Sequence, residues 1–88
     1  MTKEKLAIKI RKFLDKYACR DAEDSSEYAS PDASLMASTA HMLEMGLRIT
    51  YIPWSEWGSG GYKPYTSKTG RKEHDRIMEL IKNFVGKD

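Results

Sequence analysis

Near the end of the chain, mostly apolar side chains recur every three or four residues, and this spacing constrains the fold more than any other feature. The positions are His74, Ile77, Met78, Ile81, Phe84 and Val85. Residues with this spacing lie on one face of an α-helix, and an apolar face has to be buried against another element. The pattern therefore predicts a helix over about 70–85, with Ser67 or Thr69 as its N-terminal cap.

A second stripe with the same period predicts a helix over residues 3–18. Its apolar positions are Leu6, Ile10, Phe13, Leu14 and Tyr17. Four of these positions are directly preceded by a lysine: Lys5, Lys9, Lys12 and Lys16. This lysine stripe is therefore displaced by about 100° around the helix axis. It could face phosphate groups, or it could be a solvated flank whose alkyl stems cover the edge of the core.

A third helix is predicted from its boundaries. Ser30 can cap the helix, Pro31 suits the first helical position, and the carboxylate of Asp32 is favoured in the first turn. The helix is expected to run to about Met45 and to stop at Gly46.

Residues 47–52, with the sequence LRITYI, alternate between apolar and polar positions and are rich in β-branched side chains. They predict a short strand that ends at Pro53. A strand needs a partner for its backbone hydrogen bonds, and residues 62–65 or a second subunit could supply it. The alternative is that the preceding helix continues and breaks at Pro53.

These patterns predict a mainly α fold: a small three-helix domain with a short β or irregular segment, rich in glycine and aromatic residues, between the second and third helices. The 88 residues would form one globular domain over 1–88. Its expected core consists of Phe13, Leu14, Leu43, Ile77, Ile81 and Phe84. A core of this size gives little stability, and the chain has five methionines, so a homo-oligomer is also expected to be feasible.

Cysteine and apolar content limit the classes of protein. Cys19 is the only cysteine, so neither an intrachain disulfide nor a thiolate metal cluster can form. No segment has the roughly 18 consecutive apolar residues of a membrane span. The first residues also lack the apolar run of a signal peptide. We therefore expect a soluble cytoplasmic protein without a membrane partner.

No set of residues has the spacing of a catalytic or metal site. His41 and Glu44 are three residues apart, but no third ligand accompanies them. His74 lies in an apolar stripe, which is typical of a core or interface histidine. Residues 58–61, GSGG, are not followed by the Gly-Lys-Ser/Thr of a phosphate-binding P-loop. We expect no metal, no other cofactor and no enzymatic activity.

The segment 51–72 is the predicted binding site. Its flat rings are Trp54, Trp57, Tyr62 and Tyr65, and its cations are Lys63, Lys68, Arg71 and Lys72. The cations lie around a glycine-rich turn and the start of the last helix, whose free N–H groups favour anions. Cations that hold phosphate beside rings that stack on bases are typical of single-strand binders. The segment therefore predicts binding of nucleic acid or nucleotide phosphate.

Two other interpretations of this segment remain open. Lysine, arginine and aromatic side chains also form hot spots in protein interfaces, so the chain could be a small protein-binding regulator or inhibitor. Alternatively, Trp54 and Trp57 fold back and cover one end of a small helical core. The acidic residues Asp21, Glu23, Asp24 and Glu27, and a net charge of only +2, weaken the nucleic-acid interpretation.

Overall fold

The computed structural model describes residues 1–18, 30–52, 64–65 and 67–86. Its helices are α1 (Lys3–Tyr17), α2 (Pro31–Glu44) and α3 (Lys68–Lys82). No strand occurs among these residues, so the predicted mainly α fold with three helices is confirmed. A bilayer-spanning helix is also not found in the described parts of the chain.

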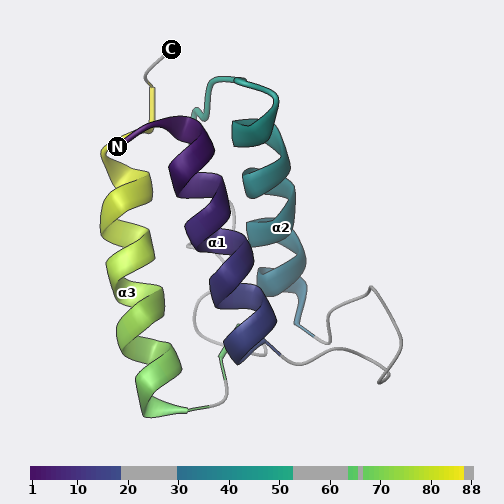
Figure 1. Cartoon of the computed structure of the whole chain (residues 1–88), viewed down its shortest axis with the longest axis vertical. Coiled ribbons are helices and arrows are strands. Elements are labelled where there is room, and N and C mark those ends of the chain that lie inside the picture. The colour runs from purple at the N-terminus through teal and green to yellow at the C-terminus, as the bar shows by residue number, and fades with distance from the viewer. Residues whose placement is uncertain (19–29, 53–63, 66, 87–88) are drawn as a thin grey trace.

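Helix α1 is the centre of the arrangement. It packs against both α2 and α3, whereas these two outer helices do not pack against each other. Figure 1 shows that α1 runs in the opposite direction to both neighbours. The C-terminal end of α1 therefore lies at the same end of the molecule as the start of α3.

Side-chain caps fix the start of each helix. The hydroxyl of Thr2 accepts a hydrogen bond from the backbone N–H of Lys5 at 3.2 Å, and that of Ser30 accepts one from Ala33 at 3.4 Å. Each satisfies an N–H group that has no partner within its helix. At α3 the cap is Ser67. This settles the choice between Ser67 and Thr69.

Gly46 ends α2 as the sequence predicts. Its φ angle is 74°, in the left-handed region that suits glycine after a helix. The backbone N–H groups of Gly46 and Leu47 donate to the carbonyls of Leu43 and Met42 at 3.0 and 2.9 Å. These bonds close the last turn, so the helix does not continue toward Pro53.

Apolar side chains from all three helices meet in one core. The buried members include Leu6, Ile10, Phe13, Leu14, Met36, Ala40, Leu43, Ile49, Ile52, Ile77 and Ile81. Five of the six predicted core residues are among them. The sixth, Phe84, is only half-buried, because α3 ends at Lys82 and Phe84 leaves its apolar face.

The strand predicted over residues 47–52 is wrong in its extent. Only Ile49 among these residues forms a bridge, which pairs it in parallel with Val85. Of the predicted partner segment 62–65, residues 62 and 63 lie outside the described residues. The N–H of Gly86 donates to the carbonyl of Ile49 at 2.6 Å. This bridge ties the segment after α2 to the segment after α3. It also explains why α3 stops short of Val85.

Candidate nucleic-acid interface

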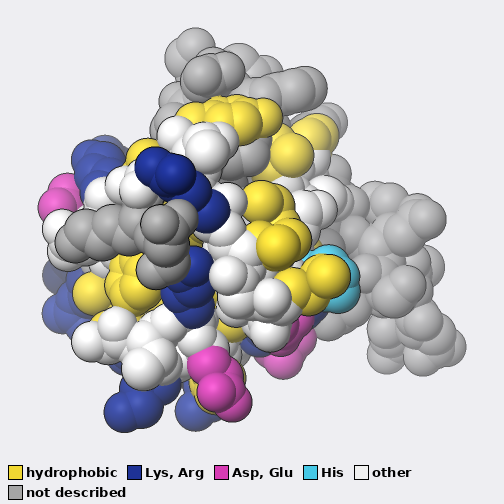
Figure 2. Space-filling model, turned by 90° about the horizontal axis from the view of Figure 1, so that it is seen from above, with side chains coloured by type: hydrophobic (Ala, Val, Ile, Leu, Met, Phe, Trp, Pro, Cys, Tyr) yellow, Lys and Arg dark blue, Asp and Glu magenta, His cyan; other side chains and the backbone are white. Residues whose placement is uncertain are grey.

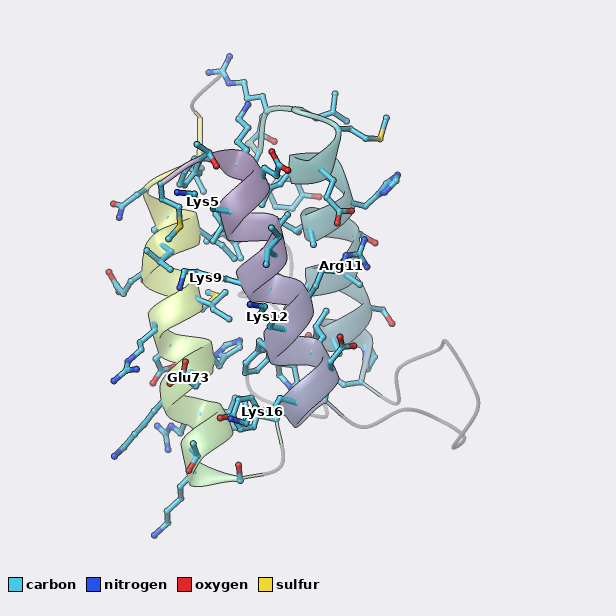
Figure 3. The ribbon with its side chains drawn as sticks, viewed as in Figure 1. Lys5, Lys9, Arg11, Lys12, Lys16 and Glu73 are labelled. Atoms are coloured by element: carbon cyan, nitrogen blue, oxygen red, sulfur yellow. The ribbon has the colours of Figure 1, made fainter. Side chains whose placement is uncertain are left out.

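The lysine stripe is exposed along the side of α1 that faces α3. Figure 3 shows Lys5, Lys9, Lys12 and Lys16 in line along the helix, with Arg11 on the side toward α2. The sequence predicted this separation of the lysines from the apolar stripe. The helix thus presents cations in the direction of α3 while its apolar face closes the core.

Arg11 has a different role from the lysines. Its guanidinium donates to both carboxylate oxygens of Glu44 in α2, at 2.8 and 3.2 Å. The hydrogen bond from Arg11 lowers the pKa of Glu44 below its usual value, and the charges of Arg11 and His41 act in the same direction. Arg11 therefore joins α1 to α2 and does not belong to the lysine stripe.

A groove lies between α1 and α3. Lys9, Lys12 and Lys16 line its α1 side, and Glu73 and Arg76 line its α3 side. Its volume of about 490 Å³ lies within the range of small-molecule binding sites in proteins. We call it the α1–α3 groove.

The floor of the α1–α3 groove is apolar. It is formed by Phe13, Tyr17, Ile77 and Leu80. Phe13 and Ile77 are buried, whereas Tyr17 and Leu80 are half-buried and expose part of their apolar surface. The Tyr17 and Phe13 rings pack in a tilted arrangement with their centroids 5.4 Å apart. The groove therefore combines an apolar floor with a lysine rim on α1 and an Arg76–Glu73 ion pair on α3.

The charge of the groove is mainly positive. Helix α1 has six basic and two acidic side chains. Among the described residues, no carboxylate pairs with Lys9, Lys12 or Lys16. The one acid of the groove, Glu73, lies 3.0 Å from Arg76. Three lysines are thus available to a negatively charged ligand.

The start of α3 adjoins the Lys16 end of the groove. A Cβ atom on Gly70 would lie 2.9 Å from Cβ of Tyr65 and 3.2 Å from Cδ1 of Tyr17, so the helix approaches the end of α1 closely. The predicted cations Lys68, Arg71 and Lys72 are exposed here. No acid occurs in the first turn of α3, although helix starts usually favour one.

The predicted aromatic residues are only partly within the described structure. Tyr65 is half-buried, and its ring centroid lies 5.3 Å from that of His74. Tyr65 therefore packs beside the core. Trp54, Trp57, Tyr62 and Lys63 lie outside the described residues.

The two histidines lie in different environments. His41 is exposed, and its Nδ1 lies 3.9 Å from Oε1 of Glu44. In the described parts of the chain, no group of three metal-binding side chains comes together. The ring of His74 packs between Phe13, at 5.9 Å, and Tyr65. His74 thus contributes to packing, as its place in the apolar stripe indicates.

Sequence reasoning identified the cations but not the groove. The period of the lysines showed which side of α1 they share, whereas the floor depends on how closely α3 approaches α1. Cations over an apolar floor can bind a polyanion that also carries flat rings.

Comparisons with known protein families, characterised proteins and solved structures give no match to this chain.

Proposed function

We propose that the protein is a non-enzymatic module that binds nucleic acid. The observation that carries this proposal is a basic surface built from two helices, consisting of Lys9, Lys12, Lys16, Lys68, Arg71 and Lys72. All six side chains are exposed, and none pairs with a described carboxylate. Such a surface releases counterions from a phosphate backbone when it binds.

The geometry favours a polyanion over a small anion. The three lysines of α1 extend over residues 9–16, which corresponds to about 10 Å along the helix axis. The cations of α3 lie at the same end of the molecule as Lys16. A single phosphate could contact only part of such a length, whereas a phosphate backbone could contact most of it.

The proposal predicts steep salt dependence. With six contacts to a single strand, affinity should fall roughly 300-fold between 50 and 200 mM salt. The assay is fluorescence anisotropy with a labelled single-stranded oligonucleotide of mixed sequence. The test variant replaces Lys68, Arg71 and Lys72 with Gln, which should reduce the salt slope by about two units.

A matched control loses the same charge at the opposite end of the molecule, with Lys3, Arg48 and Lys82 replaced by Gln. This control should keep the wild-type slope. The test variant should stay folded, because cations at a helix start oppose the helix dipole. Unchanged affinity in the test variant, or an equal loss in the control, would contradict the proposal.

A second candidate function is binding of a protein partner, including another copy of this chain. Met45 is 61% exposed, Leu47 46% and Tyr51 59%, and all three follow the end of α2. Figure 2 shows hydrophobic side chains at the surface, apart from the main group of Lys and Arg side chains. Exposed apolar groups of this kind favour a protein contact.

This second candidate predicts self-association or a stoichiometric complex that depends weakly on salt. Sedimentation of the wild type and of a Met45→Lys variant, over a range of protein concentrations, tests the self-association. A monomer at all concentrations for both proteins would exclude a homo-oligomer through this surface.

A further inference from the structure

We infer that the nucleic acid is single-stranded and that the α1–α3 groove holds one of its unpaired bases. This inference rests on the proposed function and specifies the class of ligand. The inferred base site depends on the apolar floor of the groove, whereas the salt-dependent contacts with the phosphate backbone do not.

The position of α1 disfavours duplex binding. A helix about 10–12 Å in diameter can just enter the major groove of DNA, which is about 12 Å wide. Helix α1 carries the lysine stripe, but α2 and α3 pack on its two sides. Three helices side by side are too wide for the groove, so α1 cannot insert its lysines there.

The outer helix α3 is also poorly suited to a duplex. Its exposed side chains alternate in charge, with Lys72, Asp75, Arg76 and Glu79 within two turns. The carboxylate of Glu79 additionally lies 3.5 Å from Lys82. Carboxylates on this face would repel phosphate groups on both sides of a DNA groove.

The floor of the α1–α3 groove suits an unpaired base. Leu80 and Tyr17 are half-buried and both line the groove, Tyr17 at the end near the start of α3 and Leu80 toward the C-terminal end of α3. The Nζ atom of Lys16 lies 5.4 Å from the centroid of the Tyr17 ring, so a cation and an aromatic ring are adjacent at one end. Bases of a duplex are stacked and paired, whereas a single strand can turn one base into such a site.

The lysines on the α1 rim complement the phosphates that flank an inserted base. Lys9, Lys12 and Lys16 lie on this side of the floor, whereas Arg76 on the other side pairs with Glu73. Figure 3 shows the three lysines along α1 opposite Glu73 of α3. A strand that crosses the groove would thus place phosphates near cations while its base covers Leu80.

The first test compares a single strand with a blunt duplex of the same length at the same salt concentration. Charge alone favours the duplex, because its charge density is about twice that of one strand. Base insertion reverses this order, and we expect about tenfold tighter binding of the single strand. Equal or tighter binding of the duplex would overturn the inference.

The second test changes the floor without changing the charge. Leu80→Gln should weaken single-strand binding about fivefold and leave the salt slope unchanged. The matched control is Leu47→Gln, which alters an exposed leucine that follows α2 and does not line the α1–α3 groove, and it should have no effect. An equal effect of the two variants would also overturn the inference.

The outcomes separate this inference from the proposed function. If the variant lacking Lys68, Arg71 and Lys72 binds more weakly but Leu80→Gln does not, the protein binds nucleic acid without base insertion. If no oligonucleotide binds at low salt, both statements are wrong. Tighter binding of an acidic, leucine-containing helical peptide than of the single strand would assign the groove to a protein partner and refute the inference.

Discussion

Gly70 allows α3 to begin directly against Tyr17 and Tyr65, and its replacement by alanine should destabilise the protein. The added Cβ would lie 2.9 Å from Cβ of Tyr65, 3.2 Å from Cδ1 of Tyr17 and 3.3 Å from Oγ of Ser67. Carbon atoms normally contact at about 3.5–4.0 Å. The Cβ of Tyr65 is fixed to the backbone, so the chain itself would have to move by several tenths of an ångström.

The expected cost follows from two opposing effects. Extra carbon atoms in a packed site typically cost about 1–3 kcal/mol. An alanine inside a helix gains up to about 1 kcal/mol over glycine. The net destabilisation should be about 1 kcal/mol, which corresponds to a decrease in Tm of about 4–8 °C for a domain of this size.

Thermal unfolding followed by circular dichroism measures this effect. Thr69→Ala is the control, because it changes an exposed side chain one residue earlier and should alter stability by less than about 0.5 kcal/mol. A Gly70→Ala protein that is as stable as the wild type, or more stable, would show that the close approach of α3 to Tyr17 and Tyr65 is wrong.

Two further predictions concern α2. The pKa of Glu44 is lowered by Arg11, so their contact stabilises the fold at neutral pH and is lost as pH falls through that lowered pKa. The difference in Tm between the wild type and Glu44→Gln should therefore be small at pH 7 and vanish once the pH is below that lowered pKa. Met36 is fully buried, so Met36→Ala should cost about 2–5 kcal/mol in urea unfolding, whereas the more exposed Met42→Ala should cost clearly less. A difference that persists at low pH, or equal costs for the two methionines, would contradict these assignments.

Helix positions were predictable from the sequence because their signals are local. Ser30 determines the start of α2 by accepting a hydrogen bond from the N–H of Ala33, and Pro31 suits the first helical position. Gly46 determines the end of α2 through one backbone angle. The apolar stripe likewise identified Ile77 and Ile81 as core residues. Each of these features depends only on neighbours within a turn or two.

The segment after α2 was not predictable in the same way. The alternation over residues 47–52 predicted a strand, but a strand also depends on where its partner lies. The bridge of Ile49 with Val85 joins positions on either side of α3. The sequence pattern left residues 62–65 or a second subunit as possible partners, because it carries no signal for the long-range contact with Val85.

The candidate site was predictable in part. The period of the lysines placed Lys9, Lys12 and Lys16 on one side of α1, and the sequence also marked the start of α3 as cationic. The α1–α3 groove depends on tertiary packing. Leu80 does not belong to the apolar stripe of the last helix, and nothing local indicates that it lines a groove between α1 and α3.

The most direct test of the proposed binding surface is a map of backbone amide chemical shifts during titration with a single-stranded oligonucleotide at low salt. The proposed interface predicts that the shifts concentrate in residues 9–17 and 68–80, with little change over 41–51. Shifts confined to 41–51, or no shifts at all, would contradict the assignment of the α1–α3 groove and the start of α3 as a nucleic-acid interface.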